Sequence, residues 1–359
     1  MVEMKTNWNE MKMNWNEMKC LQGQMIKKVS AISTEVKAMR EEMKRMTTEA
    51  NNVKQSLQSL SDSNYKTNSR KDIVALGGVV SGEPVAFAER FSWIDNKWTP
   101  LQPTKEKRFG AAAVVFENAI LVCGGKTLAG SETDSVEVMD MNQKPEQWLD
   151  FPAKLPFKCR GHQCVVYGNR LLVIGGYTNE NEASDCIYEV LLVPPYSAKL
   201  LYRMKLRRYC HGVALFDDKV LIVGGQTSLA FKDVLNNVEM YDITKNECKE
   251  MAPLPSAVCC MATVCWDDNV ILLGGININN DVINTVITYN IKTGESKVLP
   301  SMRSKRHGCT AVMSENKIVV MGGFGGRESL SSVECFDFLS HSWIELPSMM
   351  QPRHNITAV

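Results

Sequence analysis

The chain of 359 residues lacks an apolar run long enough to span a membrane as a helix, and its N-terminus, "MVEMKTNWNEMK", lacks the hydrophobic core of a signal peptide. We therefore expect the protein in the cytoplasm, in the nucleus or associated with the cytoskeleton. A strong charge of either sign is also missing, because 41 Lys and Arg residues balance 40 Asp and Glu residues. This balance predicts no binding to nucleic acid or to a membrane surface.

Motifs for catalysis and for metal binding are absent as well. The sequence has no GxSxG and no HExxH, and its twelve cysteines include no CxxC pair. The Gly-rich stretch "GGFGGRES", which starts at residue 322, falls in a turn between predicted strands and not before a helix, which argues against phosphate binding. We therefore predict that the protein is not an enzyme and that it needs no cofactor and no metal.

Proline and glycine are scarce in the N-terminal part only, where no proline precedes Pro84 and Gly23 is the sole glycine before Gly77. Apolar residues recur there every seven positions from Met4 to Leu60, with a second series four residues later. This 3-4 seam predicts an α-helical coiled coil over residues 1–60 that self-associates through residues 4–60, as a dimer or a trimer. A solitary amphipathic helix is the alternative. Residues 61–71, "SDSNYKTNSRK", predict a polar linker.

From residue 72 onward the sequence repeats with a period of about fifty residues. Gly-Gly pairs occur at residues 77, 124, 175, 224, 274 and 322, and each pair ends a short apolar run such as "RLLVIGG" or "KVLIVGG". Such runs are typical of buried strands, and paired glycine suits a crowded strand end where a Cβ atom would clash. An alternating strand follows each pair, and a further strand, often opened by arginine, leads to the next pair. Six units of four strands predict an all-β, six-bladed propeller over residues 72–359.

These units resemble the kelch-repeat family, whose Gly-Gly, Tyr-Asp and Trp spacing they share. Trp98, Trp148 and Trp343 stand at the tryptophan position, whereas other units depart from the pattern. Unit five, for example, reads "SAVCCMATVCW" and lacks the arginine. The resemblance implies a β-propeller that binds protein partners. The related kelch-like proteins carry a BTB domain before the propeller, and the predicted coiled coil takes that place here.

The two ends of the repeat region complement each other. The first unit starts at its Gly-Gly strand without an arginine strand before it, and the chain finishes with an arginine strand, "QPRHNITAV", without a Gly-Gly pair after it. We expect residues 353–359 to complete the first blade, because closing the ring removes its exposed strand edges.

The candidate binding face is the one where the loops after Gly-Gly meet the starts of the arginine strands, because kelch-like adaptors bind partner peptides there. Arginines and aromatic residues around a shallow ring suit the capture of acidic side chains in an extended peptide. A repeated structural role for each arginine remains equally open. The candidate residues are Arg108, Arg160, Arg208, Arg306, Arg353, Tyr177, Gln226 and Phe324.

Histidines and cysteines near the same strand starts are further candidates. His162, His211, His307 and His354 recur with the blade period, which favours a repeated structural role over a metal site. Cys159 and Cys210 lie next to arginines, and nearby cations lower the pKa of a thiol. This placement leaves redox sensing open beside the interpretation of both cysteines as small buried filler.

Taken with the resemblance, these features predict a non-enzymatic interaction module or adaptor. It binds a protein or peptide with acidic side chains on one propeller face and is multimerised by its coiled coil. A substrate receptor of the ubiquitin-ligase type is one form of that role, and an actin-binding or cytoskeletal scaffold is the alternative.

Overall fold

The computed structural model describes residues 22–23, 25, 28, 32–33, 35–45 and 71–359, and the chain divides into two units, Met1–Ser69 and Arg70–Val359. The described residues of the first unit are helical. The rest of the predicted coiled coil, and all but the last residue of the predicted linker 61–71, lie outside the described residues. No helix among the described residues is long and apolar enough to cross a membrane.

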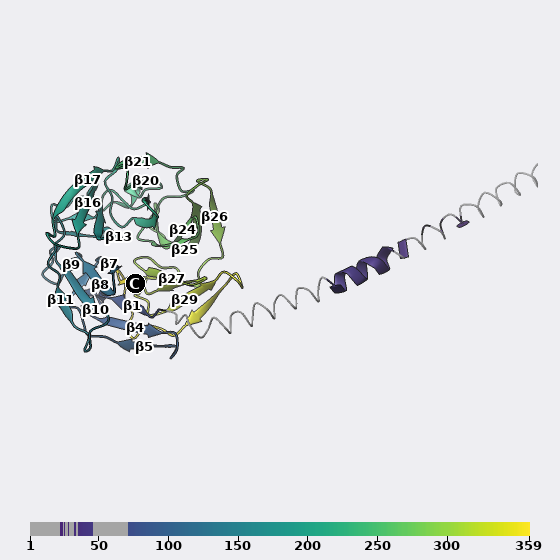
Figure 1. The fold of residues 1–359 in the computed structure, drawn as a ribbon, viewed down its shortest axis with the longest axis horizontal. Helices are drawn as coiled ribbons and strands as arrows, with labels where there is room; N and C mark the ends of the chain where they lie inside the picture. The colour runs from purple at the N-terminus through teal and green to yellow at the C-terminus, as the bar shows by residue number, and fades with distance from the viewer. Residues whose placement is uncertain (1–21, 24, 26–27, 29–31, 34, 46–70) are drawn as a thin grey trace, which may run out of the picture. The chain divides into compact units, whose positions relative to one another are not determined.

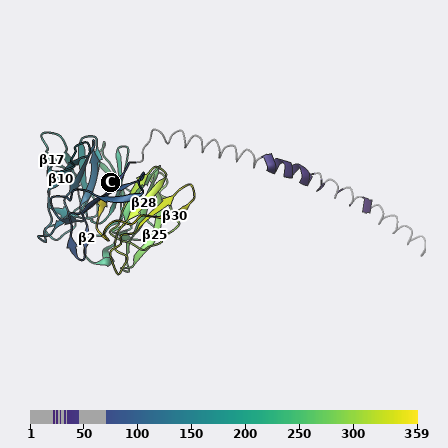
Figure 2. The same cartoon turned by 90° about the horizontal axis from the view of Figure 1, so that it is seen from below.

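The second unit consists of six β-sheets arranged around a central axis (Figure 1), and Figure 2 presents the same ring turned by 90°. The prediction of a six-bladed all-β propeller is confirmed. Each sheet is one blade of four antiparallel strands, with the first strand nearest the axis. In blade 1 the strands are β31 (Thr357–Ala358), β1 (Ile73–Leu76), β4 (Ala88–Ser92) and β5 (Lys97–Pro100).

The other blades follow the same order from the axis outward. Blade 2 contains β7 (Ala112–Phe116), β8 (Ala119–Cys123), β10 (Val136–Asp140) and β11 (Trp148–Asp150). Blade 3 contains β13 (Gln163–Tyr167), β14 (Arg170–Ile174), β16 (Cys186–Leu191) and β17 (Ala198–Arg203). Blade 4 contains β18 (Gly212–Phe216), β19 (Lys219–Val223), β20 (Val238–Asp242) and β21 (Glu247–Glu250).

Blade 5 contains β23 (Ala262–Trp266), β24 (Asn269–Asn277), β25 (Val282–Asn290) and β26 (Ser296–Leu299), and β22 (Val258–Cys259) pairs with the end of β24. Blade 6 contains β27 (Thr310–Ser314), β28 (Lys317–Met321), β29 (Val333–Asp337) and β30 (Ser342–Leu346). Short pairs lie at the loops: β2 (Val79–Val80) with β3 (Glu83–Pro84), β6 (Arg108–Phe109) with β9 (Lys126–Thr127), and β12 (Cys159–Arg160) with β15 (Tyr177–Thr178). Among residues 71–359 there is a single 3-10 turn, η1 (Phe231–Asp233), which lies in the loop of blade 4.

The hydrophobic core lies between the blades and not within any one of them. Six apolar clusters each join two neighbouring blades, and together they run round the whole ring. The alternating strands explain this arrangement, because both faces of each central strand are covered by a neighbouring blade. The buried runs that end in Gly-Gly supply the centre of every cluster.

The C-terminal strand pairs with the first strand of the repeat region. Ala358 lies opposite Ala75 and Thr357 opposite Leu76, and Val359 exchanges two backbone hydrogen bonds with Val74, at 2.8 and 3.0 Å. Residues nearly 290 positions apart thus share blade 1, and the ring has no open edge at this seam.

Candidate functional site

Six backbone groups form a closed ring around the axis on one face of the propeller. Each N–H donates to the carbonyl oxygen of the equivalent residue one blade earlier, over 2.7 to 3.1 Å. All six residues have a positive φ, between 50° and 62°. The ring residues are Gly110, Gly161, Cys210, Cys260, Gly308 and Asn355. We call the side of the propeller that carries them the ring face.

A channel of about 450 Å³ runs between the inner strands, and the ring lies at one end of it. Ala112, Gln163 and Thr310 line the channel two residues after their ring positions. Small apolar side chains, mostly alanine and valine, predominate in the lining, because the inner strands crowd together near the axis.

Gly-Gly pairs connect every blade to the next one at the ring face. The second glycine donates its N–H to a carbonyl oxygen of the following blade, as Gly78 does to Arg108 at 3.0 Å and Gly176 to Arg208 at 2.9 Å. A Cβ atom on the first glycine would meet the same carbonyl oxygen, at 2.7 Å for Gly77. The expected clash at these strand ends is therefore present, and it arises between blades.

Arg108, Arg208, Arg306 and Arg353 occupy one repeated position, two residues before the ring residue, and each is at most 1% exposed. Each guanidinium donates to the carbonyl oxygen of the first glycine in its own blade, at 2.7 to 3.0 Å. Each also pairs with a buried glutamate two strands away, at 2.5 to 2.6 Å. These pairs are Arg108–Glu137, Arg208–Glu239, Arg306–Glu334 and Arg353–Glu89.

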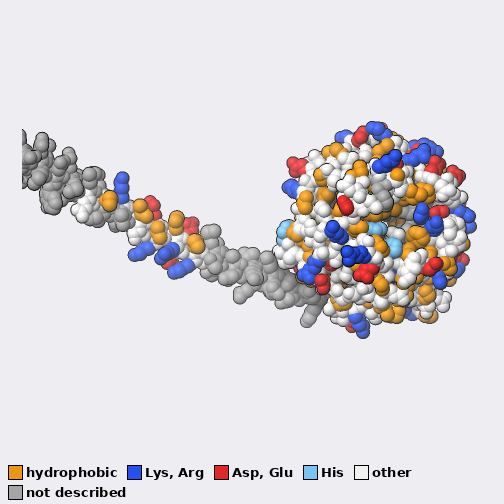
Figure 3. Space-filling model, turned by 180° about the vertical axis from the view of Figure 1, so that it is seen from behind, with side chains coloured by type: hydrophobic (Ala, Val, Ile, Leu, Met, Phe, Trp, Pro, Cys, Tyr) orange, Lys and Arg blue, Asp and Glu red, His pale blue; other side chains and the backbone are white. Residues whose placement is uncertain are grey.

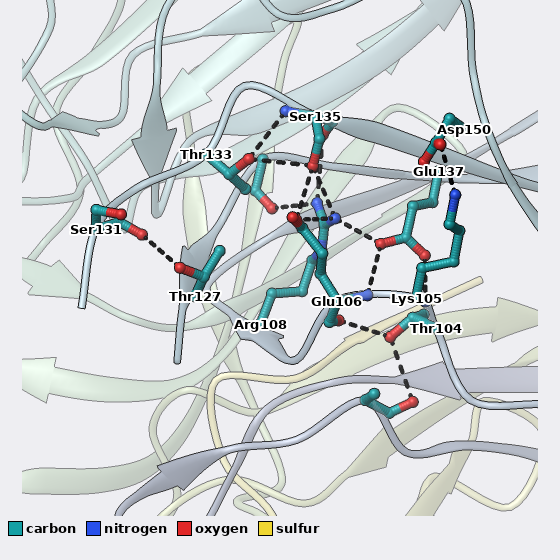
Figure 4. Close-up of polar contacts among 12 residues, drawn as sticks. Thr104, Lys105, Glu106, Arg108, Thr127, Ser131, Thr133, Ser135, Glu137 and Asp150 are labelled. Atoms are coloured by element: carbon teal, nitrogen blue, oxygen red, sulfur yellow. Dashed lines mark hydrogen bonds and ion pairs between the residues drawn. The ribbon is translucent and has the colours of Figure 1, made fainter. Parts of the chain in front are cut away.

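Figure 4 shows the contacts of the blade 2 pair, in which both terminal guanidinium nitrogens of Arg108 are bonded and Nε is not. Arg108 also contacts the side chains of Glu106 and Ser135, each at 2.8 Å. The Glu137 carboxylate accepts backbone N–H groups from Lys105 and Glu106 at 2.7 and 3.0 Å. A buried ion pair is tolerated when most of its remaining donors and acceptors are bonded in this way.

The predicted capture of a partner's acidic side chains by these four arginines is not supported. Their guanidinium groups are buried inside the blades and already neutralised by glutamates, so no face of them is open to a partner. The structural role that the sequence left open accounts for their recurrence.

Blades 3 and 5 replace both members of the ion pair together. Cys159 and Val258 occupy the arginine position in these two blades. Their carbonyl oxygens accept the N–H of the second glycine of the preceding blade, as the Arg108 carbonyl oxygen does in blade 2. The glutamate position lies opposite the strand residue that precedes the Gly-Gly pair by two. Tyr188 occupies this position in blade 3 and Ile287 in blade 5. No blade retains one charge without the other, which avoids an isolated buried ion.

Arg160 differs from the other four arginines because it lies one position closer to the ring, beside Gly161. Its side chain is 20% exposed, forms an ion pair with Glu132 at 3.1 Å and lies 4.9 Å above the ring of Tyr177. The phase difference visible in the sequence therefore places it at the surface.

The other residues at the Arg160 position are Phe109, Tyr209, Cys259, His307 and His354. Tyr177, Gln226 and Phe324, which follow Gly-Gly as predicted, pair with this position from the neighbouring strand. Tyr177 lies 4.9 Å from Tyr209, and Phe324 lies 5.6 Å from His307 and 5.4 Å from His354. The structure thus brings the three non-arginine candidates together around the ring, with Tyr177 and Gln226 largely buried.

Sequence reasoning missed three apolar side chains at the tips of the loops that follow Gly-Gly. Leu128, Leu229 and Ile278, from blades 2, 4 and 5, are 54, 63 and 52% exposed. The available signal was an apolar residue within an otherwise polar loop, which has no role in the blade. Figure 3 shows the ring face, with histidine side chains near its centre and apolar side chains around them.

The buried histidines His162 and His211 near the ring are neutral at pH 7. Burial lowers the pKa of His162 to about 4, and burial also lowers the pKa of His211. The expected lowering of thiol pKa values is wrong. Burial raises the pKa of Cys159, and interaction with Cys260 together with burial raises that of Cys210, despite the nearby arginines. The described residues contain no group of three or more His, Cys, Asp or Glu side chains arranged to hold a metal ion.

Known proteins share this repeat region. A family model described as the KLHDC2/KLHL20/DRC7 Kelch-repeats domain matches residues 110–302 and 210–359. Kelch-like protein 40 of Xenopus laevis is 27% identical over 196 residues, which cover 54% of this chain and 31% of that protein. Kelch-like protein 25 of Rattus norvegicus is 24% identical over 278 residues, which cover 63% of this chain and 46% of that protein.

The chain therefore spans less than half the length of these relatives. The family model covers well over half of the chain, in the same units that form the blades. The protein belongs to the kelch-repeat family, whose propellers bind protein partners.

Proposed function

We propose that the protein is a non-enzymatic interaction module or adaptor that binds a partner segment across the ring face. The observation that carries this proposal is the exposure of Leu128, Leu229 and Ile278 on three different loops of that face. Exposed apolar side chains on loops of one face favour a protein interface, because a partner removes them from water. Residues that repeat in all blades build the propeller, so the non-repeating loop residues are the ones available for recognition.

The partner segment carries apolar side chains as its main anchors. The four buried arginines offer no site for acidic anchors, whereas the Arg160 side chain is 20% exposed beside Tyr177. A single acidic residue of the partner fits next to Arg160, where it would compete with Glu132. The sequence predicts a partner with acidic side chains. We therefore replace that expectation with a partner segment that is mainly apolar and has one acidic residue.

Self-association through residues 4–60 completes the proposal. Among the described residues of this segment, Met25, Ile32 and Met39 follow one another at intervals of seven and are 68, 57 and 61% exposed. An exposed apolar seam at heptad spacing suits a second copy of the same helix. Two linked propellers then bind a partner assembly with higher avidity than one.

Partner capture with matched surface variants tests the proposal. The test variant carries Leu128→Ser, Leu229→Ser and Ile278→Ser. The control variant carries Ile94→Ser, Val298→Ser and Leu339→Ser, which remove apolar side chains that are more exposed, at 88, 69 and 85%, and lie outside the ring-face loops. Both proteins should melt at the wild-type temperature. Loss of a defined set of partners in the test variant alone supports the proposal, and equal retention by both variants contradicts it.

The two roles expected for this protein, ligase receptor and cytoskeletal scaffold, predict different experimental results. A ubiquitin-ligase receptor co-purifies with ligase subunits and promotes ubiquitination of its captured partner, whereas a cytoskeletal scaffold sediments with actin filaments. Because bundling needs two linked propellers, Ile32→Asp should abolish bundling while leaving the binding of one propeller intact. The molar mass of the same samples, measured by light scattering, shows whether Ile32→Asp dissociates the oligomer.

A further inference from the structure

Two cysteines occupy neighbouring positions of the central ring. Cys210 of blade 4 and Cys260 of blade 5 are joined by a backbone hydrogen bond of 2.8 Å from the Cys260 N–H to the Cys210 carbonyl oxygen. Standard backbone dimensions then limit the separation of their Cα atoms to about 6.7 Å. This limit lies within the range of up to about 6.8 Å that disulfides span.

The two thiols also interact, because each is among the groups that shift the pKa of the other. A Cβ atom placed on Gly161 would lie 3.0 Å from the Cys210 Sγ atom, so the Cys210 sulfur lies beside the neighbouring ring residue. Each of the two residues is half-buried, whereas Cys123, Cys159 and Cys164 are buried between blades.

Backbone conformation sets these two cysteines apart from their equivalents. Their φ angles are 50° and 55°, in the left-handed region that side chains with a Cβ atom rarely adopt. Three of the four other ring residues are glycine and the fourth is Asn355, the residue types that tolerate this region. Non-glycine residues in such conformations gather at functional sites more often than elsewhere.

We propose that Cys210 and Cys260 form a reversible oxidation site that closes to a disulfide between blades 4 and 5. The oxidant is a peroxide. The thiolate of one cysteine attacks one peroxide oxygen, the O–O bond breaks, and hydrogen peroxide yields a sulfenic acid and hydroxide. The sulfur of the other cysteine then attacks the sulfenic sulfur, the S–O bond breaks, and the sulfenic oxygen leaves as water. Two thiols and one hydrogen peroxide thus give one disulfide and two waters.

The two steps differ in rate. Burial contributes to a raised pKa in both thiols, so the thiolate is scarce and the first step is slow. The second step is fast because the ring holds the two cysteines in neighbouring positions.

The test treats the full-length native protein with hydrogen peroxide, alkylates the remaining thiols after denaturation and identifies linked peptides by mass spectrometry. A link between Cys210 and Cys260 is expected in the wild type and in Cys259→Ser. It should be absent in Cys210→Gly and Cys260→Gly, which copy the glycines at equivalent ring positions. The oxidised wild type should melt roughly 5 °C higher, because the bridge closes a loop of about fifty residues.

Cys123 and Cys164 provide an internal control, because their thiols are also in contact but are buried between blades. They should stay reduced while the ring pair oxidises. The proposal is overturned if no link between Cys210 and Cys260 forms. It is equally overturned if Cys260→Gly retains the link through Cys259, or if the buried pair oxidises as fast as the ring pair.

Discussion

At the scale of single residues, the repeated arginine is a structural residue because its charge is satisfied inside the blade. Arg306, for example, contacts the Gly322 carbonyl oxygen at 2.7 Å and Glu334 at 2.6 Å, and both charged residues are at most 1% exposed. The cost of burying the two charges is offset only while both are present. Stability should therefore depend on the pair and much less on either charge taken alone.

Removing one charge from this pair should be costly, and removing both should not. Arg306→Val should lower the free energy of unfolding by about 3–5 kcal/mol, because Glu334 is left buried without its partner. Adding Glu334→Ile, which copies Val258 and Ile287 of blade 5, should restore most of that loss. Urea unfolding of the wild type, the single variant and the double variant measures both effects. A double variant less stable than the single one would contradict the paired role.

The buried histidines should make the propeller sensitive to acid. The pKa of His162 is about 4 in the folded chain against 6.5 for an exposed histidine, so between these values the unfolded chain binds a proton that the folded chain does not. Stability is therefore full above pH 6.5 and falls as the pH drops toward 4, by about 3 kcal/mol from this residue. His162→Met, which copies Met261 of blade 5, should flatten the decline in urea unfolding between pH 7 and pH 5. An unchanged pH dependence would exclude this source.

At the scale of elements, the Gly-Gly turn holds one blade against the next through backbone contacts. The backbone of Gly175 has a φ of 56°, and a Cβ atom there would lie 2.5 Å from the Arg208 carbonyl oxygen. Gly168 has nearly the same φ, 60°, but nothing lies within 4 Å of its Cβ position. The two glycines separate the effect of backbone conformation from the effect of close approach.

Alanine substitution should distinguish these two effects. Gly168→Ala should cost about 1–2 kcal/mol, the usual penalty for a left-handed backbone. Gly175→Ala should cost about 2 kcal/mol more, because the blades must separate to admit the methyl group. Thermal unfolding of both variants gives the difference, and equal losses would mean that the blades do not meet at Gly175.

The strands could be predicted from the sequence because their signals are local. Runs such as "RLLVIGG" are buried on both faces, and the fifty-residue period fixes their number. The burial of the arginine side chains could not be predicted, because it depends on a distant glutamate. The glutamate lies 28 to 31 residues away for Arg108, Arg208 and Arg306 and 264 residues away for Arg353. The signal in the sequence was that blades 3 and 5 lack both the arginine and the glutamate. The sequence also shows that Arg160 lies one position out of phase with the other arginines. Only the geometry of the ring shows that this position is partly exposed.

At the scale of the whole molecule, stability depends on closing the ring with the last residues of the chain. Arg353 pairs with Glu89 at 2.5 Å, and the Asn355 backbone completes the central hydrogen-bonded ring between blades 6 and 2. Losing this segment leaves Glu89 buried without its cation and exposes the edge of β1.

A chain that ends at Pro352 should melt roughly 10 °C lower than the intact protein or fail to fold. Inserting residues 353–359 before Asp72, through four residues that complete the hairpin, should restore the melting temperature. Differential scanning calorimetry of the three proteins provides the measurement. An unchanged melting temperature after truncation would show that the seam contributes nothing.

The central claim for the whole molecule is that the ring face recognises partners through its non-repeating loop residues. A photo-crosslinking amino acid placed at Leu229, on the blade 4 loop, tests it most directly against the same group placed at Val298 on the outer strand of blade 5. The two positions are 63 and 69% exposed, so accessibility is matched. The account predicts a defined partner crosslinked from position 229 and none from position 298. The same partner crosslinked from position 298 alone, or equally from both positions, would contradict it.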